Sequence, residues 1–129
     1  MATRNRPIVD ETPPESDNTL DVVRRFQAAW DAHDLDATLA LVTDDCAFES
    51  ARPGARGERI EGRDALRAAW APGFEVGGGA FEIEELFAAG DRAVQRWRYV
   101  HGDVVVRGVD IFLVRDGRIA EKLGYVKVN

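Results

Sequence analysis

The sequence is poor in the residues that build cross-linked or metal-held scaffolds. Its one cysteine, Cys46, excludes an internal disulfide framework, and its two histidines, His33 and His101, are too few for a histidine-rich metal site. We therefore expect neither a metal nor any other cofactor. No apolar run approaches the roughly 18 residues that span a bilayer, and residues 1–17 lack the apolar segment of a secretory signal. These absences predict a soluble, cytoplasmic protein.

Positive charge is scarce as well. The 129 residues carry a formal net charge of -6 at pH 7, whereas nucleic acids and anionic membranes select concentrated basic surfaces. We therefore expect neither nucleic acid nor a membrane as a partner. The length suits one domain with one core, and 45% hydrophobic with 31% charged residues is an ordinary composition for a globular protein.

The N-terminal half predicts helices. Residues 1–17 combine three prolines with polar and acidic residues, so we expect a flexible tail before a single domain at 18–129. Helical spacing of apolar residues begins after Asn18, and a second, short helix follows Asp34 and ends at Asp44-Asp45. A short strand at 46–50, a Gly/Arg loop at 51–62 and a third helix at 63–71, stopped by Pro72 and Gly73, complete this half.

The C-terminal half changes to a strand pattern. The turn dipeptides Gly90-Asp91, Gly102-Asp103 and Asp116-Gly117 separate four predicted strands, at 80–89, 92–101, 104–115 and 118–128. The sequence therefore predicts an α+β fold, in which a curved antiparallel sheet packs on three N-terminal helices. That sheet consists of the four-stranded meander and the short first strand.

Asp110 interrupts the apolar run of the third of these strands, 107-RGVDIFLVRDGR-118. A buried carboxylate costs several kcal/mol unless it is paired or neutralised. A two-residue turn at Gly102-Asp103 places Gln95 opposite Asp110. The next turn leaves two registers open, because a three-residue loop opposes Asp110 to Lys122 and a two-residue loop opposes it to Leu123. We favour the first register, which gives the carboxylate a charge partner.

Three segments together carry a resemblance to a known family. In this order, VVRRFQAAWDAHDLDATLALVTDDCAFES, EGRDALRAAW and VRGVDIFLVRDGRIAEKLGYVK resemble the nuclear transport factor 2-like superfamily, and within it the SnoaL-like branch, over residues 18–128. The resemblance implies a cone-shaped, cystatin-like fold with a pocket between sheet and helices. It also implies that Asp110 faces this pocket, as a strand Asp does in the distantly similar ketosteroid isomerases.

The sequence departs from the enzymes of that superfamily at three diagnostic positions. Ser50 stands where ketosteroid isomerases have a general-base Asp, and Phe26 stands where they have an oxyanion-binding Tyr. Gly124 replaces an essential Asp of limonene epoxide hydrolases. Steroid isomerase activity is therefore not expected, and fold alone constrains function poorly.

The predicted site is an aromatic-lined pocket for a small apolar or polycyclic organic ligand. Asp110 and Lys122 are the candidate catalytic residues, for cofactor-free isomerisation, cyclisation, hydration or hydrolysis by acid/base chemistry. Two alternatives stay open: the pair is a structural salt bridge, or the protein is a non-catalytic binding or accessory module. The candidate substrate-binding residues are Phe26, Trp30, Ser50, Trp70, Gln95, Trp97, Tyr99 and Phe112.

The outer face of the third strand is also apolar, with Val105, Val109, Ile111 and Leu113. A strand that is apolar on both faces needs cover on both. We therefore predict a homodimer that forms through the convex face of the sheet, the pairing that the resemblance also implies.

Overall fold

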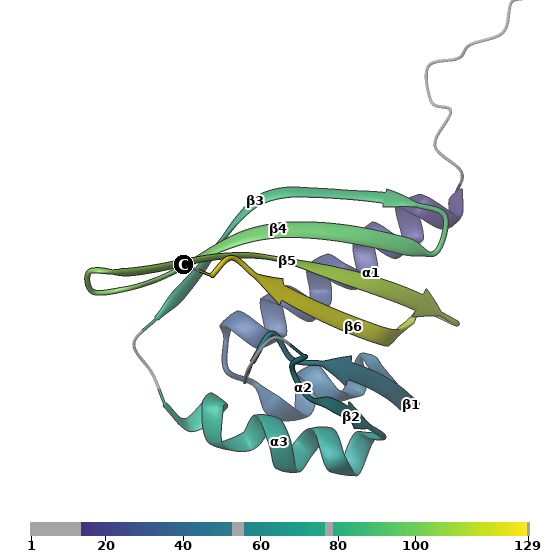
Figure 1. The fold of residues 1–129 in the computed structure, drawn as a ribbon. Coiled ribbons are helices and arrows are strands. Elements are labelled where there is room, and N and C mark those ends of the chain that lie inside the picture. Colours follow the sequence, from purple (N-terminus) through teal and green to yellow (C-terminus); the bar gives the residue numbers. More distant parts are fainter. Residues whose placement is uncertain (1–13, 53–55, 77–78, 129) are drawn as a thin grey trace, which may run out of the picture.

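The fold is built from one curved sheet and three helices, seen in a computed structural model that describes residues 14–52, 56–76 and 79–128. The six strands lie in the order β2-β1-β6-β5-β4-β3. Helix α1 packs against β3 to β6, and α3 packs against β1 and β2 (Figure 1). The elements are α1 (Pro14–Asp31), α2 (Leu35–Ala40), β1 (Val42–Glu49), β2 (Arg59–Glu61), α3 (Arg63–Glu75), β3 (Ala80–Ala89), β4 (Arg92–His101), β5 (Val104–Arg115) and β6 (Arg118–Val126).

The predicted α+β architecture is confirmed, with one correction to the sheet. The meander β3-β4-β5-β6 begins and ends within two residues of the predicted bounds. However, β1 pairs with β6 in parallel and β2 pairs with β1 in antiparallel orientation, so the sheet is mixed rather than antiparallel. Strand β2 lies in the segment 51–62 that the sequence predicted as a loop.

Helix α1 begins earlier than predicted. Residues 14–17 belong to the helix rather than to a tail, and residues 1–13 lie outside the described part of the chain. Proline is favoured in the first helical turn. The backbone N–H of Gly90 donates to the Ser16 hydroxyl (2.8 Å), and the Thr19 hydroxyl donates to the Gly90 carbonyl (2.7 Å). These bonds fix the start of α1 to the β3–β4 turn.

The acidic pair Asp44-Asp45 does not end a helix. Helix α2 ends at Ala40, and β1 begins at Val42. The two carboxylates lie exposed at an irregularity in the β1–β6 pairing. There Asp45 accepts a hydrogen bond from the Thr43 hydroxyl (2.8 Å) and pairs with Arg115, contacts that lower the pKa of Asp45. The bulge thus exposes both carboxylates to solvent while β1 remains a continuous strand.

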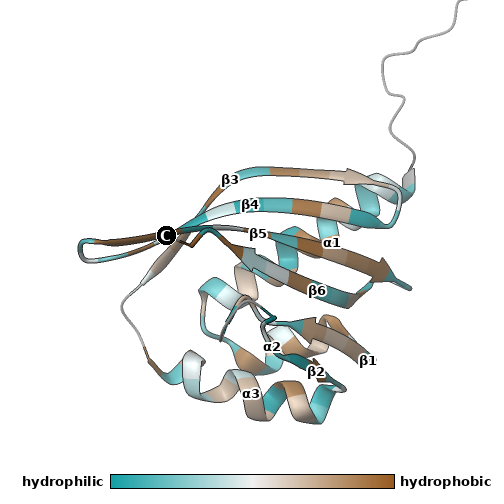
Figure 2. Ribbon diagram, viewed as in Figure 1, coloured by the Kyte–Doolittle hydropathy of each residue, from teal (hydrophilic) through white to brown (hydrophobic). Residues whose placement is uncertain are grey.

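Helix α3 also runs past its predicted end. It continues through Pro72 to Glu75, although proline removes one backbone hydrogen bond. The residues after Pro72 are held by tertiary packing, since the rings of Phe74 and Trp30 lie 5.0 Å apart. The C-terminal part of β5 is hydrophobic (Figure 2), and there Phe112 and Val114 enter the core. Within the described ranges, no helix is long and apolar enough to cross a membrane.

Candidate active site

Asp110 and Lys122 meet in a small space on the concave face of the sheet. The space, which we call the inner chamber, has a volume of about 140 Å3. Lys122 Nζ donates to Asp110 Oδ2 at 3.4 Å, and each side chain is 9% exposed. The chamber is lined by Gln27, Trp30, Phe48, Ala51, Phe81, Trp97, Asp110, Lys122 and Gly124.

The route by which these two residues meet differs from both predicted registers. Asp110 is opposite Gly124, and Lys122 is opposite Phe112. The turn has two residues, with positive φ at Asp116 and Gly117, and a bulge follows it in β6. The bulge moves Lys122 onto the concave face, diagonally across from Asp110, which is within reach of a long side chain.

The charge of Lys122 lies among aromatic rings. Its Nζ is 4.8 Å from the ring centroid of Trp30, 5.1 Å from that of Phe48 and 5.9 Å from that of Phe112. When the ammonium is desolvated, such cation–π contacts stabilise it by about 2 kcal/mol or more. An ammonium has three N–H donors, and the contact with Asp110 engages one of them. Among the described residues, the other two donors have no hydrogen-bond acceptor.

A chain of hydrogen bonds leads from the chamber to the surface. Gln95, which is 1% exposed and opposite Asp110 in the sheet, donates to Gln27 Oε1 (2.9 Å). Gln27 in turn donates to the Asp31 carboxylate (2.8 Å). The Gln95 side chain thus supports the chamber wall through Gln27, rather than lining the chamber as predicted.

A larger space, the outer cavity, adjoins the inner chamber. It has a volume of about 570 Å3 and shares Trp30, Phe48 and Phe81 with the chamber. Its wall is mainly aromatic: the other rings are Trp70, Phe74, Tyr99 and the imidazole of His33. The structure therefore places three predicted ligand-binding residues, Trp30, Trp70 and Tyr99, around one cavity.

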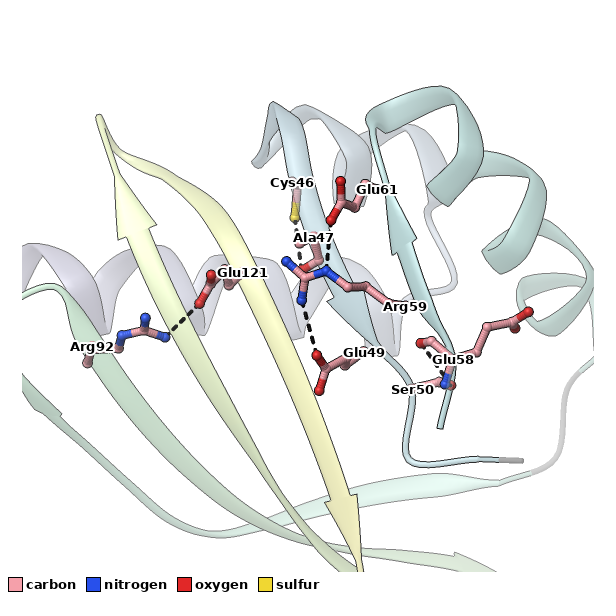
Figure 3. Close-up of polar contacts among 9 residues, drawn as sticks. All are labelled: Cys46, Ala47, Glu49, Ser50, Glu58, Arg59, Glu61, Arg92 and Glu121. Carbon is pink, nitrogen blue, oxygen red and sulfur yellow. Dashed lines mark hydrogen bonds and ion pairs between the residues drawn. The ribbon is translucent and has the colours of Figure 1, made fainter. Parts of the chain in front are cut away.

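A third space, the side hollow, lies beyond Trp97. It has a volume of about 430 Å3, and Phe81, Trp97 and Tyr99 form its inner wall. Ser50 lies here rather than in the inner chamber. Its hydroxyl accepts from the Glu58 backbone N–H (3.0 Å) and donates to the Arg52 carbonyl, so it holds the loop after β1 (Figure 3). Ser50 therefore does not line the inner chamber with Asp110.

Two other predicted ligand-binding residues are core residues. Phe26 and Phe112 are both fully buried, their ring centroids lie 6.0 Å apart, and neither lines the three spaces. Phe112 still contributes through Lys122, because its ring backs the ammonium. Glu49, the last residue of β1, lies on the outer side of the sheet, where it pairs with Arg59 at 3.1 Å (Figure 3).

Five residues that line the chamber are absent from the candidate site residues: Gln27, Phe48, Ala51, Phe81 and Gly124. Gln27 precedes Trp30 by about one helical turn, which places both residues on one face of α1. The position of Gln27 beside Trp30 could therefore be predicted from the sequence. The inward direction of Phe81 could not be predicted from the sequence. A regular hairpin would oppose it to Val100 on the outer face, but a bulge between Ile83 and Glu85 opposes it to Tyr99 on the inner face.

The described residues hold no group of three or more His, Cys, Asp or Glu side chains placed to bind a metal ion. The buried indole N–H groups of Trp70 and Trp97 have no hydrogen-bond acceptor within the described ranges. Both rings belong to cavity walls. The site is therefore rich in donors and aromatic surface, with Asp110 as its buried carboxylate.

Comparison with known proteins places this arrangement in a family. The SnoaL-like domain matches residues 23–122. A nuclear transport factor 2-like protein of unknown function from Mesorhizobium loti is 39% identical, with 92% of this chain and 98% of that chain covered and a TM-score of 0.82. Among curated proteins, none matches the chain.

Two more distant solved structures share the fold. A candidate ketosteroid isomerase from Kribbella flavida is 21% identical over 89% of this chain and 82% of that chain, with a TM-score of 0.77. An LEH-like epoxide hydrolase from M. tuberculosis is 23% identical over 88% and 86% of the two chains, with a TM-score of 0.68. At these identities the likeness extends to the fold and no further.

Proposed function

Because the chain belongs to the SnoaL-like domain family, we propose that it binds a small, largely apolar organic molecule and transfers a proton within it. Asp110 is the acid/base, and the Lys122 ammonium binds the oxygen of the reacting group. The observation that carries the proposal is the Asp110–Lys122 pair, buried in a chamber that adjoins an aromatic cavity of about 570 Å3. Perturbed or buried charge pairs in such cavities are functional-site candidates.

The geometry supports proton transfer next to a carbonyl group. The carbonyl oxygen accepts a hydrogen bond from Lys122, and the Asp110 carboxylate removes a proton from the adjacent carbon. The electron pair of the broken C–H bond forms the enolate, whose negative charge is held by the ammonium in a site of low dielectric. Asp110 then returns the proton to another carbon, which isomerises the substrate. Alternatively, the enolate carbon attacks a second carbonyl carbon of the substrate, the C=O π electrons move onto that oxygen, and the oxygen takes the proton from Asp110, which cyclises the substrate.

One observation favours a second candidate, a non-catalytic binding module. The inner chamber is small, about 140 Å3, and Asp110 already contacts Lys122 within it. A pair that serves only to close the cavity floor would have this geometry too. In that case the outer cavity alone would bind the ligand, and removal of the carboxylate would leave the affinity unchanged.

The test is a thermal-shift screen of polycyclic and terpenoid ketones with the wild-type protein, Asp110→Asn and Asp103→Asn. Asp103 is an exposed turn carboxylate and serves as the matched control. Ligands that raise Tm are then incubated with each protein in D2O, and deuterium uptake next to the carbonyl is followed by NMR. We expect uptake with the wild type and Asp103→Asn and none with Asp110→Asn. Equal binding without uptake would identify a binding module, and no stabilising ligand would refute both candidates.

We also propose that the protein is a homodimer that pairs through the convex face. Phe87, Val105 and Tyr125 expose 51–53% of their surface there. Ion pairs lie on the same face, among them Arg107–Glu84 (3.3 Å) and Arg92–Glu121 (2.8 Å), of which Figure 3 shows the second. Protein interfaces outside obligate complexes are about as apolar as the rest of a protein surface, so a face that mixes exposed apolar residues with ion pairs is compatible with dimer formation.

A further inference from the structure

Phe81 lies where the three spaces of the site meet. Among the described residues, it is the one side chain that lines the inner chamber, the outer cavity and the side hollow. It is the second residue of β3, the strand that begins after α3 and forms one edge of the sheet (Figure 1). The ring therefore separates spaces that would otherwise be continuous.

The position of this ring depends on one backbone feature. The bulge between Ile83 and Glu85 turns Phe81 inward, opposite Tyr99. Its ring lies 4.8 Å from that of Tyr99 and 5.2 Å from that of Trp97, the latter nearly perpendicular at 83°. These two rings hold Phe81 on the sheet side, while its other side faces the passage from the outer cavity to the inner chamber.

Trp30, Phe48 and Phe81 form the neck of that passage, because they line both the outer cavity and the inner chamber. Two of these rings are held in place by further contacts. Trp30 and Phe48 contact the Lys122 ammonium, and their rings pack against Trp70 at 5.1 and 5.4 Å. Phe81 has neither contact, so it is the edge of the neck whose size can change without disturbing the charge pair.

We propose that Phe81 sets the width of the ligand that can reach Asp110 and Lys122; this inference rests on the proposed function. A cavity of about 150 Å3 holds benzene, so the inner chamber holds about one aromatic ring. The ligand class is therefore a flat molecule that places one ring with an oxygen at its tip in the chamber, while a second ring fused in line with the first lies in the outer cavity. A ligand that is broader at this end stops in the outer cavity.

The experiment uses two fluorescent phenols, 2-naphthol with two fused rings and 1-hydroxypyrene with four. Dissociation constants are measured from probe fluorescence with the wild type, Phe81→Ala and Phe81→Leu. Phe87→Ala is the matched control, since Phe87 lies on the same strand but is exposed on the convex face. Each probe is also titrated into Lys122→Met and into the double variant Phe81→Ala/Lys122→Met, and circular dichroism verifies that every variant folds.

We expect Phe81→Ala to shift the ratio of the two affinities at least tenfold toward 1-hydroxypyrene, with Phe81→Leu intermediate and Phe87→Ala unchanged. Binding of 2-naphthol should weaken in Lys122→Met. Binding of 1-hydroxypyrene should depend on Lys122 only after Phe81 is truncated, because only then does its oxygen reach the ammonium.

An unchanged affinity ratio in folded Phe81→Ala and Phe81→Leu, with 2-naphthol still dependent on Lys122, would overturn the role of Phe81 and leave the proposed function standing. If 2-naphthol binds the wild type and Lys122→Met with equal affinity, this result would contradict the proposed function and the inference built on it. The same holds if neither phenol binds the wild-type protein.

Discussion

Loss of the Asp110 carboxylate should destabilise this protein far more than loss of an ordinary surface charge. The Asp110–Lys122 pair is separated by 3.4 Å, and both side chains are 9% exposed. At an effective dielectric constant of about 20, this separation corresponds to a Coulomb attraction of about 5 kcal/mol. Burial of each ion costs several kcal/mol, so the intact pair is close to neutral overall. Asp110→Asn removes the attraction but leaves the ammonium buried.

We therefore expect Asp110→Asn to lower the free energy of unfolding by about 3–5 kcal/mol, a large part of the 5–15 kcal/mol typical of a domain. Lys122→Met should cost a similar amount, because it leaves the carboxylate unpaired. The double variant should lie within about 2 kcal/mol of the wild type, since no buried charge remains. Urea unfolding at pH 7 of the four proteins gives the coupling energy directly.

The control for this cycle is Asp21→Asn. Asp21 pairs with Arg25 one helical turn away, at side-chain exposures of 64% and 54%, and such pairs contribute about 0.3–0.5 kcal/mol. A loss below about 1 kcal/mol in Asp110→Asn, comparable with that control, would refute the reasoning. It would mean that water reaches the pair, and that the inner chamber does not provide the low dielectric on which the proposed proton transfer depends.

Three further predictions concern other parts of the molecule. Burial raises the pKa of the Cys46 thiol to about 12, whereas the thiol of the unfolded chain loses its proton near pH 9. Between these two pH values the native state binds more protons than the unfolded chain. The free energy of unfolding therefore falls in this range as pH rises. Urea unfolding at pH 8 and pH 10 should show a smaller fall in Cys46→Ala, and equal falls would contradict the assignment. In Gly108→Ala, the added Cβ would meet the Tyr125 carbonyl oxygen at 2.6 Å and also the Trp97 ring, so the free energy of unfolding should drop by about 1–3 kcal/mol; an unchanged urea midpoint would show that β5 and β6 can move apart freely. Tyr125→Asp should convert a dimer to a monomer in analytical ultracentrifugation, whereas Val76→Asp, at an exposed valine that ends α3, should not; a monomeric wild type would refute the predicted pairing.

The sequence was most informative where turns are short and regular. Gly102-Asp103 fixes the β4–β5 register, so the pairing of Gln95 with Asp110 was predictable. The inward direction of the carboxylate was expected from the family resemblance. The parallel contact of β1 with β6 was not, because strands that pair across the whole chain leave no local signal. The bounds of α1 and α3 depended on tertiary contacts, namely those of Ser16 with Gly90 and of Phe74 with Trp30.

Two β-bulges explain where the site differs from the prediction: Lys122 was predicted as the partner of Asp110 but reaches it from another register, and Phe81 was not predicted at all. One extra residue in a strand exchanges its inner and outer faces, and alternation in the sequence does not reveal where the extra residue lies. Without the bulge in β6, Lys122 would lie on the convex side, and without the bulge in β3, Phe81 would as well. The charge partner of Asp110 and the ring at the neck of the chamber thus depend on backbone irregularities. Because bulges also bend a strand, the same two features curve the sheet and supply the chamber with its cation and its neck.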